Sequence, residues 1–170
     1  MTAIVLLTLD HAAAESLAGE PSIFAERHGL VLAPHESTAV GIARATAGFL
    51  ATNGAVLPWC GYLALVGPLR RVAGTCGFKG GPDADRAVEI AYFTFPGEEG
   101  RGVATEMARA LVRMASTAEL AIAVVRAHTL PERNASCRVL EKLGFSRADD
   151  VIDPEDGPVW RWEQRVVNTL

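Results

Sequence analysis

The stretch from residue 95 to 107, FPGEEGRGVATEM, places three glycines within six residues, after an apolar run and before a helical pattern. A strand, a glycine-rich turn and a helix N-terminus together suit an anion, because the turn's N–H groups point outward and the helix start carries partial positive charge. Glycine also lets the backbone approach a phosphate without a Cβ in the way. The stretch is therefore either a phosphate-binding loop or an ordinary turn with a glycine-assisted helix start, and spacing alone leaves both open.

Two nucleotide-binding patterns can be excluded for this loop. The P-loop pattern G-x-x-x-x-G-K-[ST] is absent. The dinucleotide pattern G-x-G-x-x-G fails because Thr105 stands where the third glycine would follow Gly100 and Gly102. The preceding strand also lies mid-chain after hairpin-like strands, which does not fit a doubly wound nucleotide-binding domain.

The elements around the loop indicate one α/β domain, residues 1–170, with a mixed sheet. A strand at Thr2–Leu9 precedes three predicted helices, and two strands at Tyr62–Val66 and Val72–Phe78 resemble a hairpin. The continuous apolar run Leu120–Ala127 is typical of a strand buried on both faces of a sheet. The other predicted elements are a strand at Ala87–Phe95, a helix at about 103–116, a helix that Asn134 or Ser136 starts and Gly144 ends, and last strands near Phe145–Ala148 and Val159–Val166.

Composition excludes several classes of partner. The chain has 170 residues, 49% of them hydrophobic, and a net charge of −4 without a lysine and arginine stripe, so nucleic acid is not an expected partner. The apolar stretches are shorter than a membrane helix needs, and the N-terminal run has no basic region, so neither a membrane nor a signal peptide is expected. The three cysteines include no C-x-x-C pair, which indicates a reducing, cytoplasmic setting, no disulfide framework and no metal site.

Two blocks carry a resemblance to a known family. The loop Glu99-Gly-Arg-Gly-Val-Ala104 resembles the acyl-CoA loop Q/R-x-x-G-x-G/A of GNAT-type N-acetyltransferases, with Glu99 where the family usually has Gln or Arg. The segment Ala127–Phe145, AHTLPERNASCRVLEKLGF, is similar to the "hT…N-x-S…vLEKlGF" segment of the ribosomal-protein acetyltransferase-like (RimJ/RimL) branch. The ending Val159–Trp162 is similar to the last strand of that branch, so the resemblance spans roughly residues 60–165.

The resemblance implies a fold, a cofactor and a reaction. The fold is a mixed, mostly antiparallel sheet of six or seven strands, with helices on both faces and a splay between the two central parallel strands. The cofactor is acetyl-CoA, without a metal, and its pantetheine arm enters the splay. The acetyl group passes by direct attack to a primary amine, either a protein N-terminus or a small molecule. Many members of the family are dimers, so a homodimer stays open.

The resemblance also implies roles for individual residues. Glu89 would act as a general base through a water, because an alkyl amine with a pKa of about 10 is protonated at neutral pH. Ser136 would contact the departing thiolate, since Leu140 occupies the place of the tyrosine that protonates the thiolate in many family members. Taken alone, Glu89 could instead face solvent and Ser136 could instead cap its helix. The residues implied to bind the cofactor are Tyr92, Phe93, Thr94, Phe95, Glu99, Gly100, Arg101, Gly102, Val103, Ala104, Thr105, Asn134 and Ser136.

The departures from the family pattern keep two other functions open. Glu99 and Leu140 are atypical, and Asn134 lies one residue from the commonest asparagine position, which Arg133 fills. An acyl-CoA-binding regulatory or sensor domain with little or no turnover is therefore an alternative, and a structural domain without a cofactor is a third. His128, beside the second block, is interpreted as a structural residue.

Overall fold

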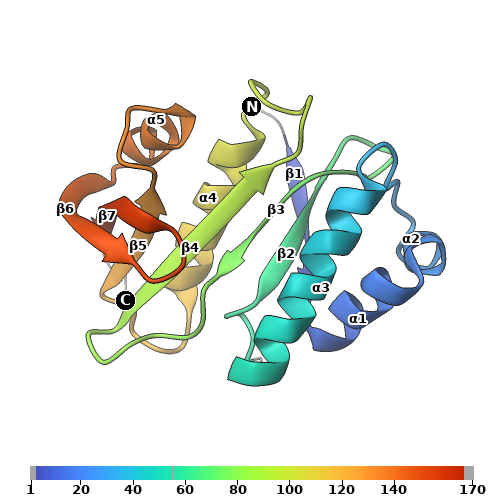
Figure 1. Ribbon diagram of the computed structural model, residues 1–170, viewed down its shortest axis with the longest axis horizontal. Coiled ribbons are helices and arrows are strands. Elements are labelled where there is room, and N and C mark those ends of the chain that lie inside the picture. Colours follow the sequence, from blue (N-terminus) through green and yellow to red (C-terminus); the bar gives the residue numbers. More distant parts are fainter. Residues whose placement is uncertain (1–2, 55, 167–170) are drawn as a thin grey trace.

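The computed structural model describes residues 3–54 and 56–166, and its centre is a seven-stranded mixed sheet (Figure 1). The strand order is β1-β2-β3-β4-β5-β7-β6, and only the β4–β5 pair is parallel. This confirms the predicted fold class, although Thr2 of the first predicted strand lies outside the described residues. The strands are β1 (Ile4–Leu9), β2 (Gly61–Val66), β3 (Arg71–Phe78), β4 (Ala87–Thr94), β5 (Val124–Thr129), β6 (Ser146–Asp153) and β7 (Gly157–Arg165).

Helices cover both faces of the sheet. The helices α1 (His11–Gly19), α2 (Pro21–His28) and α3 (Glu36–Asn53) lie on one face, and α4 (Val103–Thr117) and α5 (Ala135–Lys142) lie on the other (Figure 1). Because side chains alternate along a strand, β2 sends Leu63 and Leu65 into the core under α1–α3, and Tyr62 and Ala64 into the core under α4. These two cores fix the position of β4, and the glycine loop follows the C-terminal end of that strand.

The predicted splay between the central parallel strands is present. Pairing of β4 with β5 runs from Ala87–Val124 to Ile90–Ala127 and then stops. Beyond that point β4 continues to Thr94 paired with β3, while β5 continues paired with β7. The carboxyl ends of the two strands therefore diverge and open the sheet, as Figure 1 shows.

Two predicted strands differ in extent from the observed ones. The strand predicted from Leu120 begins only at Val124, and Leu120 is 60% exposed, because the partner strand β4 starts at Ala87. The strand predicted near Phe145–Ala148 extends instead to Asp153 and forms a hairpin with β7. The Asp153 carboxylate accepts the N–H groups of Glu155 and Asp156, which fixes a turn at residues 154–156 between the two strands.

Candidate active site

The loop between β4 and α4 requires its glycines. Gly97, Gly100 and Gly102 have φ angles of 85°, 74° and 83°, a left-handed region that side chains disfavour. Gly102 is the N-cap residue of α4, and no side-chain hydrogen bond caps the helix within the described chain. The first N–H groups of α4 therefore lie at the positive end of the helix without a capping oxygen, as an anion site needs.

A cleft of about 530 Å³ lies between this loop, the end of β4 and the start of α5. Its lining includes many of the residues implied to bind the cofactor: Tyr92, Phe93, Thr94, Glu99, Gly100, Gly102, Val103, Ala104, Thr105 and Ser136. It also includes Glu98, Ala135, Arg138, Val139 and Lys142, which sequence reasoning missed. The loop and the second block, which are far apart in the chain, thus meet at one cavity.

Three residues implied to bind the cofactor lie outside this lining. Phe95 is fully buried under α1–α3, because β4 ends at Thr94 and the next side chain turns into that core. The Arg101 guanidinium contacts the Glu98 carboxylate at 3.3 Å. The Asn134 side-chain oxygen accepts the Cys137 N–H at 3.1 Å and caps α5.

Glu98 fastens the loop to the sheet. Its buried carboxylate accepts hydrogen bonds from Arg71 Nε at 3.0 Å and Nη2 at 2.8 Å, and His35 Nε2 lies 4.0 Å away. The hydrogen bonds from Arg71 outweigh burial and hold the pKa of Glu98 below its ordinary value. Arg71 lies on β3, 27 residues before Glu98, so no local sequence pattern predicts this ion pair.

Helix α5 forms one side of the cleft and contributes a hydroxyl group and two cationic side chains to it. Because Asn134 supplies the cap, the Ser136 hydroxyl is not used to cap α5. The Tyr92 hydroxyl donates to the Ser136 carbonyl at 3.4 Å and joins the two walls. Burial raises the pKa of Tyr92 to about 12, so this hydroxyl keeps its proton at neutral pH. Arg138 and Lys142, spaced i and i+4 on one helix face, bring positive charge to the cleft, and that spacing was a signal the sequence offered.

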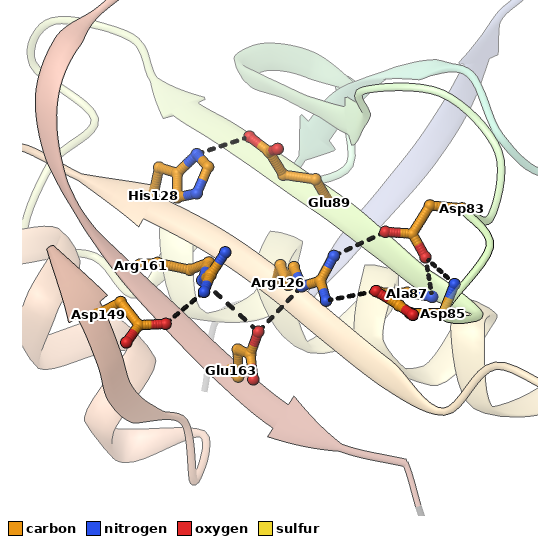
Figure 2. A network of polar contacts seen from close by, with 9 residues as sticks. All are labelled: Asp83, Asp85, Ala87, Glu89, Arg126, His128, Asp149, Arg161 and Glu163. Atoms are coloured by element: carbon orange, nitrogen blue, oxygen red, sulfur yellow. Dashed lines mark hydrogen bonds and ion pairs between the residues drawn. The ribbon is translucent and has the colours of Figure 1, made fainter. Parts of the chain in front are cut away.

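Glu89 lies outside the cleft, in a polar network on the sheet face opposite α4. Its Oε1 atom is 3.2 Å from His128 Nδ1 (Figure 2). The same carboxylate oxygen is 3.1 Å from Lys79 Nζ, and His128 Nδ1 is 3.6 Å from Asp153 Oδ2. Along β4, Glu89 precedes Phe93 by four residues, or about 13 Å at the usual rise of a strand. A proton that passes to Glu89 from an amine beside Phe93 therefore needs a chain of several waters.

A second part of that network fixes the start of β4. Arg126 Nη1 on β5 is 2.7 Å from Asp83, and its Nε is 2.9 Å from Glu163 on β7 (Figure 2). The other Asp83 oxygen accepts the N–H groups of Asp85 and Ala87, each at 2.9 Å. These contacts join the turn before β4 to β5 and β7, and so set the position of Glu89.

The family follows from a sequence match over most of the chain. Residues 4–146 match the family described as the acetyltransferase (GNAT) domain. The chain belongs to the GNAT acetyltransferases. No curated protein matches this GNAT chain in sequence.

Solved structures share the GNAT fold at low identity. A spermidine N-acetyltransferase chimera from Vibrio cholerae and hSSAT is 12% identical, with a TM-score of 0.65, over 97% of this chain and 95% of its own. An aminoglycoside acetyltransferase in complex with coenzyme A is 20% identical, with a TM-score of 0.62, over 96% of this chain and 95% of its own. The ribosomal alpha-N-protein acetyltransferase RimL in complex with coenzyme A is 14% identical, with a TM-score of 0.64, over 99% and 97%. These neighbours come from several branches of the GNAT family, and their likeness to this chain shows the shared fold.

The described part of this GNAT domain contains no group of side chains that could hold a metal ion. None of its described helices is both long and apolar enough to span a bilayer. A second cavity, of about 400 Å³, meets the cleft at Tyr92 and Phe93 and lies under α3. The GNAT domain therefore has two adjoining cavities, one beside the glycine loop and one on the other side of β4.

Proposed function

We propose that the chain is an acetyl-CoA-dependent N-acetyltransferase that transfers an acetyl group to a primary amine by direct attack. The observation that carries the proposal is the uncapped α4 N-terminus and its left-handed glycines, which border a cleft at the splay of β4 and β5. Such a backbone cradle suits a pyrophosphate, which has several negative oxygens and needs donors without steric bulk. Acetyl-CoA, when bound, supplies the activated thioester.

Different parts of the cleft hold different parts of the cofactor. The backbone from Glu99 to Thr105 holds the pyrophosphate, and Arg138 and Lys142 add positive charge from α5. The gap beyond Ile90 and Ala127, where strand pairing stops, takes the pantetheine arm. Each part uses a feature that the described residues provide without rearrangement.

Backbone donors at the splay stabilise the charge that forms on the carbonyl oxygen during attack. The Phe95 N–H donates to Ala73 on β3, and backbone groups alternate in direction along a strand. The N–H groups of Tyr92 and Thr94 therefore point to the side where β5 has diverged. A donor held in place before the reaction lowers the barrier because it needs no reorganisation.

Proton transfers use Glu89 and Ser136 in this proposal. Glu89 accepts the proton of the incoming ammonium through a chain of waters, and the neighbouring Lys79 and His128 hold its carboxylate in place. The Ser136 hydroxyl, which the Asn134 cap leaves available, contacts the departing thiolate. A thiolate of pKa about 8.5 needs only weak assistance, so a hydroxyl can replace the tyrosine that Leu140 displaces.

The second block supports membership of the RimJ/RimL-like branch as part of the proposal. A protein N-terminus and a small-molecule amine both fit the reaction. A cytoplasmic setting is also proposed, and the free thiols of Cys60, Cys76 and Cys137 agree with a reducing compartment.

Two measurements test the proposal in sequence. Acetyl-CoA and CoA should each raise the melting temperature of the purified protein, because a ligand that binds only the folded state stabilises it. Incubation of the protein with acetyl-CoA and a panel of amines should then release thiol only when protein and amine are both present. Absence of any thermal shift with either form of the cofactor would reject the proposal at its first step.

A further inference from the structure

The second cavity is an open groove on the α3 side of the sheet. Its roof is α3, and its floor is formed by β2, β3 and the end of β4. Two exposed phenyl rings, Phe49 on α3 and Phe93 on β4, stand at its edge with 40% and 49% of their surface accessible. Exposed aromatic rings at the edge of a cavity indicate a surface that an apolar ligand would cover.

Small residues create this groove. Gly61 and Gly77 face each other across β2 and β3, and a Cβ on Gly77 would meet the Cys60 carbonyl oxygen at 2.7 Å. On α3, Ala45 and Thr46 lie above this glycine pair, and the Thr46 methyl group is 3.4 Å from where a Cβ on Gly61 would lie. Close approach of the strands and short side chains on the helix together leave about 400 Å³ unfilled, the size of a small-molecule site.

The groove contains almost no charge. Lys79 carries the one charged side chain among the described residues of its lining. Burial opposes the charged ammonium, but the hydrogen bond and the negative charge of Glu89 outweigh burial and raise the pKa of Lys79. Lys79 therefore stays cationic and forms an ion pair with Glu89, with 3.1 Å between Lys79 Nζ and Glu89 Oε1.

The groove also has a direction. Phe93, at one end, is shared with the cofactor cleft, whereas Glu89, with Lys79 paired to it, lies about 13 Å further back along β4. An amine that reaches the splay past Phe93 would lay the rest of its body over Ala91 and the glycine pair. Its far end would point toward the Lys79 ammonium.

We propose that the acceptor is a small monoamine with an apolar body, aliphatic or aromatic, which lies in this groove with its amino group toward Phe93. This inference rests on the proposed acetyl transfer and narrows its acceptor. A second ammonium at the far end would lose its hydration in an apolar groove and face a cation, so polyamines and aminoglycosides fit poorly. An extended peptide would need backbone hydrogen-bonding partners that a largely apolar groove of this size does not offer.

The sharpest test compares two amines of equal size. We expect n-hexylamine and phenethylamine to be acetylated with kcat/KM at least about tenfold above cadaverine, which has the heavy-atom length of n-hexylamine with a second ammonium at its end. Spermidine and kanamycin should be poorer still. Equal or better turnover of cadaverine or spermidine, or a clear preference for a peptide with an apolar N-terminus, would overturn the inference.

Variants locate the effect in the groove. Thr46→Phe from α3 and Ala91→Leu from β4 should each raise the KM for n-hexylamine at least about tenfold, while the affinity for CoA stays unchanged. Ala51→Phe places the same ring on an exposed position of α3 outside the groove and is the matched control. Melting temperatures identify any variant that fails to fold, and the two filling variants come from different elements, so loss of one leaves the test intact.

Lys79→Met tests the charge directly. Without the lysine, the second ammonium of cadaverine is attracted by the Glu89 carboxylate instead of repelled by the Lys79 ammonium, so the ratio of kcat/KM for n-hexylamine to that for cadaverine should fall at least about tenfold. The ratio is informative because both amines meet the same altered site. An unchanged ratio would contradict the role of Lys79.

Binding measurements separate this inference from the proposed reaction. Calorimetric titration of the CoA-bound protein with n-hexylamine should show binding that Thr46→Phe abolishes and Ala51→Phe preserves. If amines bind in this way but no thiol is released, acetyl transfer fails and the groove assignment stands. If thiol is released with other amines but n-hexylamine does not bind, the reaction stands and the groove assignment fails.

Discussion

The carboxylate of Glu99 accepts a hydrogen bond from the backbone N–H of Gly97 at 2.6 Å. The acidic side chain at the family's Gln or Arg position therefore folds back onto the loop that carries it. The N–H groups of α4, at the other end of the loop, stay available to an anion. This contact makes an acidic residue at position 99 compatible with the proposed binding of a phosphate by the loop.

Glu99→Gln should strengthen cofactor binding slightly. Glutamine keeps an oxygen that can accept the Gly97 N–H and removes a negative charge from the lining of the cleft. At an exposed site the gain should be about 0.5–1 kcal/mol, so the Kd for acetyl-CoA should fall about two- to fivefold at low salt and less at high salt. Calorimetry at two salt concentrations measures this. A higher Kd of Glu99→Gln than of wild type for acetyl-CoA at low salt would mean that Glu99 is needed for more than its hydrogen bond to Gly97.

Gly102→Val should reduce cofactor affinity. Residue 102 has φ of 83°, which valine tolerates poorly, so the loop would shift its N–H groups at the start of α4. We expect the Kd for acetyl-CoA to rise at least about tenfold. Gly80→Val is the matched control, since Gly80 also has positive φ, at 109°, but lies outside the cleft. If both variants lose affinity equally, general strain rather than the loop is responsible.

Glu98→Gln should destabilise the protein in a pH-dependent way. The carboxylate is buried against Arg71, so removal of its charge should cost about 3 kcal/mol of unfolding free energy at pH 7. Because the pKa of Glu98 is lowered in the folded state, its contribution is complete above the unfolded pKa of about 4.3 and disappears as pH falls through the lower folded value.

Urea denaturation at pH 7 and at pH 3 measures the difference between wild type and Glu98→Gln. That difference should shrink at the lower pH. Glu119→Gln, at an exposed position, is the control and should change little at either pH. A difference that is constant with pH would show that packing, and not the Arg71 pair, explains the loss.

Local signals in the sequence were sufficient for the fold class and for the position of the glycine turn. The order of periodic segments predicted the mixed sheet, and the glycines of 97–102 predicted a tight turn before a helix, which their positive φ angles bear out. Whether that turn binds an anion stays a prediction that rests on the family resemblance. What could not be predicted depends on contacts between distant segments. The Arg71–Glu98 anchor joins residues 27 apart, and the groove exists only because α3 lies over the Gly61–Gly77 pair of two adjacent strands.

The second block shows where a local pattern is ambiguous. Asn134 and Ser136 are both good N-cap residues, so sequence alone could not decide which one starts the helix. The backbone decides it, since Asn134 is extended and its side chain reaches the Cys137 N–H. Once Asn134 is the cap, Ser136 lies within the first turn and lines the cleft.

Because Asn134 caps α5 and Ser136 lines the cleft, alanine at position 134 should affect stability and alanine at position 136 should affect activity. Asn134→Ala removes the cap and should cost about 1 kcal/mol, which lowers the melting temperature by about 2–4 °C in a domain of this size. Ser136→Ala should leave the melting temperature unchanged and lower kcat about tenfold with little change in the KM for acetyl-CoA, because thiolate contact matters only as the bond breaks. Thermal denaturation and steady-state kinetics on both variants measure the two effects. A Ser136→Ala variant that loses stability like Asn134→Ala and keeps its kcat would assign Ser136 to the helix and leave the thiolate without a protein donor at this position.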